Sequence, residues 1–291
     1  MHSGFITVLG RPSAGKSSLI NRICGQKISI VSAVPQTTRN TVRGIYTEDR
    51  GQIIFLDTPG YHDSKKKFNL HMRDLAQNSL SEVDAVLYVL DSSRKPGLEE
   101  EAISAFLRRS SLPIIAAVTK TDLHSADPES ASAFLCKELP ESISAKVSAA
   151  TGEGIDSLLS RLFEALPEDE YMYPPEFYTD QDPEFRASEI IREKAIAETE
   201  QEVPHALYVD IADMEADEDK NRLWIRAFLV VERKSQKGIV IGKKAQKIKA
   251  IRKAAQKELN SIFPYQVSLD LMVKVNPKWR KKDWILKNLI Q

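Results

Sequence analysis

The residue pattern best suited to chemistry lies near the start of the chain. It fits G-x-x-x-x-G-K-[ST] and consists of Gly10, Arg11, Pro12, Ser13, Ala14, Gly15, Lys16 and Ser17, followed directly by Ser18. In such a loop the backbone N–H groups converge on phosphate oxygens, and a following helix adds the positive end of its dipole. Lys16 is then placed to reach the β- and γ-phosphates, and the Ser17 hydroxyl to bind Mg²⁺. The pattern predicts a nucleoside-triphosphate site.

The segments around this loop indicate the fold that positions it. Buried strands are predicted at 5–9, 85–90 and 114–118, and helices at 18–23, 99–109 and 152–165. A chance match in a glycine-containing turn is the alternative, and the strand before the loop and the helix after it argue against that alternative. Apolar strands that alternate with amphipathic helices predict an α/β domain with a parallel-rich sheet flanked by helices.

An acidic residue ends a further predicted strand. Runs at 41–47 and 52–56 form a predicted hairpin, because turn-forming residues at 48–51 separate them. The second run leads into Asp57, Thr58, Pro59 and Gly60. In a nucleotide site the Asp57 carboxylate holds Mg²⁺, usually through water, and the Gly60 N–H faces the γ-phosphate.

The segment before the hairpin offers one more Mg²⁺ ligand. Residues 26–39 have no sustained period and predict an extended loop, in which Thr37 and Thr38 are both candidates. Contacts with the γ-phosphate and Mg²⁺ hold such loops, so hydrolysis is expected to release 36–41 and 60–69. The residues expected to act in catalysis are Lys16, Thr38 and Gly60.

Two later motifs follow predicted strands and point to the base. Thr119-Lys120-Thr121-Asp122 looks like an N-K-x-D motif, and Ser148-Ala149-Ala150 looks like an S-A-K/L element. Ligand groups in an open α/β sheet gather beyond the carboxyl ends of the strands, so all these clusters are expected to form one pocket. In this order, over residues 1–166, they resemble the translation-factor-class GTPases.

That resemblance implies a guanine site with GTP, GDP and Mg²⁺ as cofactors. Asp122 would accept hydrogen bonds from guanine N1 and N2, the Ala149 N–H would meet O6, and the stem of Lys120 would pack over the base. Adenine would leave these groups unpaired, which corresponds to a preference on the order of 10⁴-fold for guanine.

Three residues depart from the family pattern. Thr119 replaces the usual Asn, and we expect the guanine preference to survive this change. Ser13 replaces the Asn of potassium-stimulated relatives, so no potassium dependence is assigned. Tyr61 follows Gly60 in place of a Gln that orients the attacking water, so slow intrinsic hydrolysis is expected without an activator.

The second half of the chain has a different character. Prolines interrupt all periodicity at 167–183, which predicts a linker between a first domain at 1–166 and a second at 184–291. The net charge of the chain is zero, but residues 168–219 contain 3 basic and 18 acidic residues, whereas 233–291 contain 16 basic and 3 acidic. This asymmetry indicates that the last segment meets a polyanion.

Coarse elements in this half predict a small α+β domain. Residues 184–201 have helical spacing, 205–211 and 223–231 are strand-like, and the acidic stretch 213–220 predicts a solvated turn. From Ala245 to Leu259, small and apolar residues recur at spacings of three and four, which predicts a helix. Trp279 is expected in the core.

The loop before that helix, I-G-x-x-G-x-x-I in pattern, resembles the loop of type II KH domains, which clamps single-stranded nucleotides. The resemblance implies RNA contacts by Gly242, Lys243, Lys244, Ala245, Lys247 and Lys249. Ala245 stands where the second glycine is usual. If that position needs a positive φ, alanine costs about 1 kcal/mol; if it begins the helix, alanine is harmless.

Together the two halves resemble the Era family of bacterial ribosome-assembly GTPases. The resemblance implies binding near the 3′ end of small-subunit ribosomal RNA, a role in assembly of the 30S subunit, and peripheral association with the inner membrane. A cytoplasmic location is expected, since Cys24 and Cys136 fit no disulfide framework or zinc knuckle, and no apolar run or export signal is evident. The protein is expected to be a monomer. The alternatives are a signalling GTPase whose basic domain binds protein, and an ATP-dependent small-molecule kinase.

Overall fold

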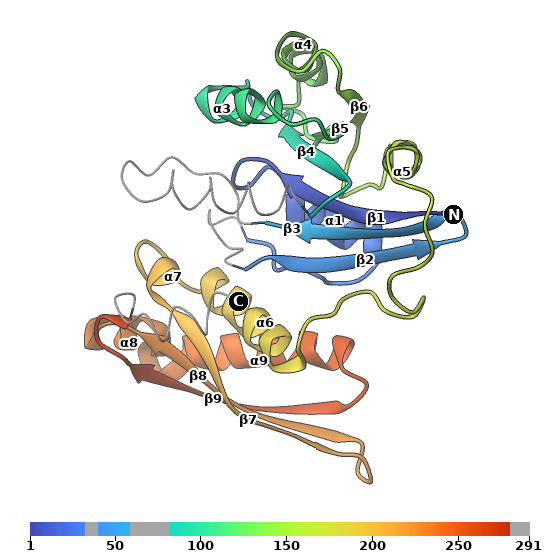
Figure 1. Ribbon diagram of the computed structural model, residues 1–291. Coiled ribbons are helices and arrows are strands. Elements are labelled where there is room, and N and C mark those ends of the chain that lie inside the picture. The colour runs from blue at the N-terminus through green and yellow to red at the C-terminus, as the bar shows by residue number, and fades with distance from the viewer. Residues whose placement is uncertain (33–39, 59–81, 280–291) are drawn as a thin grey trace. The chain divides into compact units, whose positions relative to one another are not determined.

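The structure is a computed structural model that describes residues 1–32, 40–58 and 82–279. The described residues divide into two compact units, shown with their element labels in Figure 1. The first contains residues 1–29, 40–58 and 82–180, and the second contains 30–32 and 181–279. Among the helices of these described ranges, none is long and apolar enough to cross a membrane.

A six-stranded sheet forms the centre of the first unit, in the order β2-β3-β1-β4-β5-β6. Its strands are β1 (His2–Leu9), β2 (Val42–Glu48), β3 (Gly51–Asp57), β4 (Ala85–Asp91), β5 (Ile114–Thr119) and β6 (Ile143–Lys146). The neighbours from β3 to β6 pair in parallel, and β2 pairs with β3 as an antiparallel hairpin. The predicted parallel-rich sheet is confirmed.

Helices pack on this sheet because its strands are apolar on both sides. The helices described in this unit are α1 (Lys16–Cys24), α3 (Leu98–Leu107), α4 (Pro128–Glu138) and α5 (Ile155–Glu164). Alternate residues of β4, namely Val86, Tyr88 and Leu90, share one core with apolar side chains of α3 and α4. Leu87 and Val89 point to the opposite face and are equally buried, as expected for a strand covered on both sides.

The proline-rich segment after α5 has no regular helix or long strand, but it is hydrogen-bonded to the first unit. Pro167 O accepts from Ser3 N (3.1 Å), and Tyr178 O accepts from Ile45 N (2.9 Å). Arg43, also on β2, forms an ion pair with Asp180 (2.6 Å). Residues 167–180 therefore run from the start of β1 to the β2 edge of the sheet as part of this unit.

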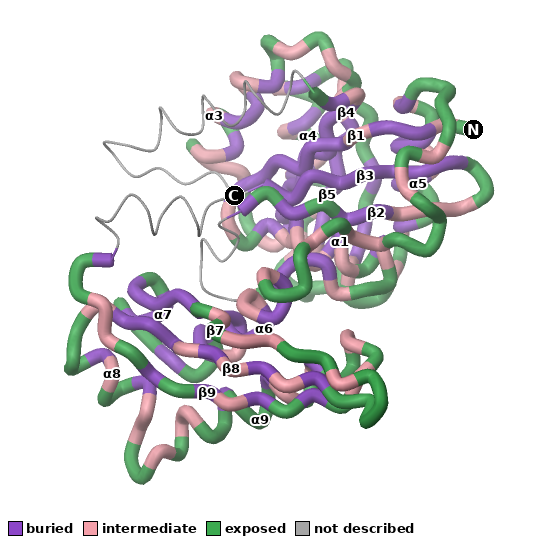
Figure 2. The backbone as a smooth tube through the Cα atoms, turned by 60° about the horizontal axis from the view of Figure 1, so that its bottom comes forward, coloured by how far each residue is buried: buried purple, intermediate pink, exposed green. Residues whose placement is uncertain are grey.

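The second unit is a three-stranded sheet, β7-β8-β9, with helices on one face. Its elements are α6 (Pro183–Ala197), α7 (Val203–Ala206), β7 (Tyr208–Asp217), β8 (Arg222–Val231), α8 (Lys234–Ile241), a 3₁₀ turn (Lys243–Ala245), α9 (Gln246–Ile262) and β9 (Gln266–Val275). β8 pairs antiparallel with β7 and parallel with β9. Figure 2 shows the alternation of buried and more exposed residues along β8 that places every second side chain in the core.

The core of this unit confirms the predicted face of the last helix. Ile251, Ala255 and Leu259 of α9 are fully buried against the sheet, together with Ile190 and Ile191 of α6. Trp279 is also buried, as expected: its indole N–H donates to Ala206 O (3.0 Å), and its ring packs edge-on against Tyr208.

Two predictions for this half were wrong, and one helix was missed. The acidic stretch 213–220 was predicted as a turn, but β7 continues through it to Asp217 and pairs with β8. Within this pairing Asp213 lies close to Arg226 (3.7 Å). His205 lies in α7 instead of a strand, since Pro204 suits a first helical turn. Helix α8 was not predicted because its β-branched end, Ile239 to Ile241, has the composition of a strand.

Candidate nucleotide-binding site

The phosphate loop connects the end of β1 to the start of α1, as predicted. Gly10 lies so close to β4 that a Cβ there would be 2.5 Å from Val89 O, which excludes any side chain. Gly15 has φ +100° and directly precedes α1, so the turn into the helix uses a conformation that favours glycine. Ser13 also adopts a positive φ (+61°). These backbone constraints shape the loop before any phosphate enters it.

Lys16 is buried within this loop. Its ammonium donates to two loop carbonyls, Gly10 O (3.0 Å) and Arg11 O (3.2 Å). Burial lowers the pKa of Lys16 to about 8, against the opposing effect of the Asp57 carboxylate. A bound phosphate group would add negative charge beside this ammonium and favour its protonated form.

The residues for Mg²⁺ fit a divalent cation. Ser17 Oγ donates to Asp57 Oδ2 over 2.7 Å, which brings the two predicted ligands together. Asp57 is completely buried, and its Oδ1 has no hydrogen-bond partner among the described residues. Burial raises the pKa of Asp57, while Lys16 and Ser17 oppose that shift. A hydroxyl and a carboxylate with an uncompensated oxygen are the hard donors that Mg²⁺ prefers.

The base-recognition motifs converge at the same edge of the sheet. Asp122, at the surface, accepts a hydrogen bond from the buried Ser148 Oγ (2.6 Å), which fixes one of its carboxylate oxygens. Backbone hydrogen bonds from Gly152 N to Ser148 O (2.9 Å) and from Ser148 N to Glu153 O (3.0 Å) shape the turn that contains Ala149 and Ala150.

Thr119, which stands in place of the usual Asn, is hydrogen-bonded to the phosphate loop. Its Oγ1 donates to Ala14 O over 2.7 Å and also lies 3.2 Å from Leu90 O. The hydroxyl therefore connects the end of β5 with both the loop and the end of β4. Lys120 follows with φ +61°, a left-handed conformation that turns its side chain away from the strand direction.

Part of the predicted site lies outside the described residues: Thr37, Thr38, Pro59 and Gly60, with most of the two loops expected to respond to hydrolysis. Thr58 is described, and its hydroxyl donates to Val8 O (2.9 Å). This hydrogen bond joins the ends of β3 and β1.

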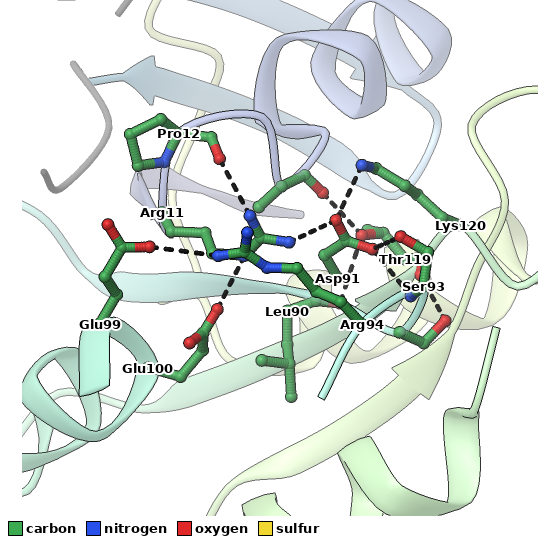
Figure 3. A network of polar contacts seen from close by, with 12 residues as sticks. Arg11, Pro12, Leu90, Asp91, Ser93, Arg94, Glu99, Glu100, Thr119 and Lys120 are labelled. Carbon is green, nitrogen blue, oxygen red and sulfur yellow. Dashed lines mark hydrogen bonds and ion pairs between the residues drawn. The ribbon is translucent and has the colours of Figure 1, made fainter. Parts of the chain in front are cut away.

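Two acidic residues near the site were missed by the sequence analysis. Asp91 ends β4, and Glu100 lies in the first turn of α3; both form ion pairs with Arg11. Figure 3 shows this network, which also includes Lys120. The signal that singled out Asp57, an acidic residue at the end of a buried strand, applies to Asp91 as well. Arg11 therefore directs its guanidinium at β4 and α3, and offers only its backbone to a phosphate.

The predicted RNA loop of the second unit has an unusual backbone. Gly242, Lys244 and Ala245 all have positive φ (+71°, +51° and +58°). Lys243, Lys244 and Lys249 are exposed, and Lys247 is half-buried beside Gly242, where a Cβ would meet its Cγ at 2.8 Å. Of the two alternatives for Ala245, the strained one holds, because this alanine is left-handed.

Two family models match the chain, one in each half. Residues 5–120 match the model described as a 50S ribosome-binding GTPase, and residues 202–280 match the KH domain model. Curated relatives match along the whole length. GTPase Era of Treponema denticola is 49% identical over 99% of both chains, and GTPase Era of Borreliella burgdorferi is 45% identical over 100% of both.

Solved structures agree with these relatives. A variant of Aquifex aeolicus Era bound to GDP·AlF4⁻ is 34% identical, with a TM-score of 0.91 over 99% of this chain and 98% of that one. A structure of Era in complex with MgGDPNP and nucleotides 1506–1542 of 16S ribosomal RNA has the same identity, coverage and TM-score. The resemblance drawn from the sequence is confirmed: the chain belongs to the Era family of GTPases.

Proposed function

We propose that this protein is a GTP-hydrolysing switch that binds small-subunit ribosomal RNA near its 3′ end and assists assembly of the 30S subunit. The observation that carries the nucleotide part is the convergence of two contacts, Ser17 with Asp57 and Asp122 with Ser148, beyond the carboxyl ends of parallel strands. The first contact suits Mg²⁺ and phosphate, and the second suits guanine. An ATP-dependent kinase would not need the contact between Asp122 and Ser148.

The nucleotide is expected to be GTP or GDP with Mg²⁺. This assignment is supported by relatives solved with GDP·AlF4⁻ and with MgGDPNP. The residues assigned to the nucleotide are those of the phosphate loop from Gly10 to Ser18, Asp57 to Gly60, Thr119, Lys120, Asp122, and Ser148 to Ala150. Mg²⁺ is assigned to Ser17, Asp57, and Thr37 or Thr38.

Hydrolysis transfers the γ-phosphoryl group to water, and the protein contributes mainly position and charge. Lys16 would donate to phosphate oxygens in place of the loop carbonyls, and the Ser17 hydroxyl and the Asp57 carboxylate would hold the cation. When bound, Mg²⁺ neutralises charge on the phosphate oxygens. Gly60 and Thr38 are assigned to the γ-phosphate side. Tyr61 offers no amide to orient water, so we expect slow turnover without an activator.

The RNA part of the proposal rests on the positively charged loop at Gly242 and the start of α9. Exposed Lys243, Lys244 and Lys249, with Lys247 beside them, can neutralise the phosphates of a single strand. The Era structure solved with nucleotides 1506–1542 of 16S ribosomal RNA supports the choice of RNA.

We extend the proposal to the organisation of the whole chain. The GTPase domain is assigned to 1–166, the linker to 167–183 and the KH domain to 184–291. We assign the protein to the cytoplasm as a monomer, with peripheral attachment to the inner membrane as the accompanying hypothesis. Flotation with anionic vesicles tests that attachment, and light scattering tests the monomer.

The decisive experiment titrates the full chain against RNA of the sequence 1506–1542, labelled at one end, at fixed salt. Binding is followed by fluorescence anisotropy with a non-hydrolysable GTP analogue and with GDP. Tighter binding with the analogue supports a switch that couples nucleotide and RNA. Equal binding contradicts the coupling, and no binding in either state contradicts the RNA assignment and favours the signalling GTPase.

A charge-matched pair of variants makes this test specific. Lys243→Asp with Lys244→Asp should weaken RNA binding by at least 10-fold and reduce its salt dependence. The control, Lys220→Asp with Arg222→Asp, removes the same charge from exposed residues at the other end of β8. That end is about 30 Å away along the ten-residue strand. Equal losses in the two pairs would contradict the loop as the RNA site.

A further inference from the structure

Asp91 connects the two halves of the nucleotide site through one buried carboxylate. Its Oδ2 accepts from Arg11 Nη2 of the phosphate loop (2.6 Å) and from Lys120 Nζ of the base motif (2.8 Å). Its Oδ1 accepts from the backbone N (2.8 Å) and the Oγ (2.6 Å) of Ser93. Figure 3 shows the two cations approaching this carboxylate from different loops. Every strong acceptor direction of Asp91 is thus engaged.

Arg11, one of these two cations, also forms an ion pair with a second carboxylate. Arg11 is buried, and its Nε lies 2.7 Å from Glu100 Oε1. Glu100 in turn accepts from Gly97 N (2.8 Å) with Oε2, which ties it to the start of α3. A guanidinium buried between two fixed carboxylates has one orientation, so Arg11 holds the phosphate loop against β4 and α3. Removal of one carboxylate would leave buried charge poorly compensated.

Lys120 depends on Asp91 in a different way. Its side chain is partly exposed, at 31%, and its stem is the part that the family places over the guanine base. A lysine stem is flexible, and the contact with Asp91 anchors its ammonium end. Burial alone would raise the pKa of Asp91, but hydrogen bonds from Lys120 and Ser93 hold it below its usual value. The Asp91 carboxylate therefore remains ionised and stays paired with the Lys120 ammonium.

We propose that Asp91 is a positioning residue for guanine-nucleotide binding, which presents the Lys120 stem to the base and fixes Arg11 in the phosphate loop. The proposal rests on the guanine-nucleotide site described above. Because GTP and GDP share the base and the β-phosphate, Asp91 contributes to the binding of both. It contributes nothing that differs between ground state and transition state, so its loss should raise KM and leave kcat unchanged.

The test uses the full chain with Asp91→Asn. Asparagine keeps an acceptor for Ser93 and the same shape, but it cannot accept both cations. Equilibrium binding of fluorescent GDP and of a GTP analogue should weaken by about 10- to 100-fold, with faster release and with kcat within about 3-fold of wild type. Asp84→Asn is the matched control, since this carboxylate lies before the opposite end of β4 and binds Phe5 N (2.8 Å). Its nucleotide affinity should equal that of wild type.

A double-mutant cycle separates positioning from a general structural role. If Asp91 acts through Lys120, then Lys120→Met and Asp91→Asn together should weaken GDP binding by less than the product of the two single losses. Fully multiplicative losses would overturn the proposal, as would wild-type affinity in Asp91→Asn. A wild-type protein that binds no guanine nucleotide would overturn the proposed function as well, so the two failures are distinct.

A milder variant keeps the test decisive if Asp91→Asn does not fold. Ser93→Ala removes one hydrogen bond to Oδ1 and leaves both ion pairs, so the fold should persist with a circular dichroism spectrum like that of wild type. We expect GDP affinity to fall about 3-fold, with the loss absent in the Lys120→Met background. Unchanged affinity in folded Ser93→Ala would overturn the proposal.

Discussion

Ser17 Oγ and Asp57 Oδ2 are 2.7 Å apart, so the phosphate loop and the end of β3 touch through a hydroxyl and a carboxylate. The parallel pairing of β1 with β3, which sets Val8 beside Asp57, brings these two loops together. The other oxygen of Asp57 is buried without a hydrogen bond among the described residues. The pair is therefore prepared for a cation before any nucleotide is bound.

This arrangement predicts a specific defect for Ser17→Ala. The variant loses one Mg²⁺ ligand but keeps the backbone of the phosphate loop, so the gain in nucleotide affinity on adding Mg²⁺ should fall by at least 10-fold. Dissociation constants for GDP measured with Mg²⁺ and with EDTA test this expectation. In EDTA the variant should bind GDP like wild type, and an equal Mg²⁺ effect in both proteins would remove Ser17 from the cation site.

Guanine selection is assigned to Asp122, whose carboxylate is held by Ser148 (2.6 Å). In Asp122→Asn the amide NH₂ faces the 2-amino group of guanine, which also donates, whereas xanthine presents a carbonyl oxygen at that position. We expect GTP affinity to fall by more than 100-fold and xanthosine triphosphate to bind more tightly than GTP. Competition binding measures the ratio. Tight binding of xanthosine triphosphate by the variant would show that it is folded. An unchanged ratio of its affinities for GTP and xanthosine triphosphate would contradict the assignment of Asp122.

The left-handed conformation of Ala245 predicts that glycine there stabilises the second unit. Ala245→Gly removes the clash of Cβ at φ +58° and should raise the free energy of unfolding by about 1 kcal/mol. All three tryptophans, Trp224, Trp279 and Trp284, lie in this half of the chain, so their fluorescence in urea reports on it alone.

Ala250 provides the matched control for that substitution. It is exposed within α9, so Ala250→Gly should lower the free energy of unfolding by about 1 kcal/mol. The same sign for both variants would contradict strain at position 245.

The two cysteines should differ in reactivity. Burial raises the pKa of the Cys24 thiol to about 12, whereas Cys136 is exposed on α4. Since the thiolate is the reactive form, and Cys24 stays protonated until the pH approaches 12, its alkylation at pH 8 should be on the order of 10³-fold slower than in the unfolded chain. Mass spectrometry after iodoacetamide, with and without urea, measures both sites. Cys24 is half-buried, so labelling of Cys24 that is as fast in the folded protein as in urea would contradict the raised pKa of its thiol.

The hydrophobic periodicity of the sequence was sufficient to predict most of the fold. Apart from α4 and β6, for which no positions were predicted, the strands and helices described in the first unit begin and end within a few residues of their predicted positions, because their apolar patterns match what each element must bury. It was insufficient for α8, where a helix of strand-like composition is stabilised by its Gln236 side chain. The Oε1 of Gln236 accepts from Glu232 N (3.0 Å) and Arg233 N (2.9 Å), a capping contact that no hydrophobic period predicts.

The sequence by itself determined the chemistry of the phosphate loop and of the base motifs. Their function depends on a few residues in a short, ordered run, so spacing points to Lys16 and Ser17, and the resemblance to a family motif points to Asp122. Only the tertiary structure decided the ion pairs of Asp91, whose partners lie 80 and 29 residues away in the chain. It also decided the strain at Ala245. Ion pairs between distant loops and backbone φ angles arise from strand pairing and packing, and no local pattern specifies them.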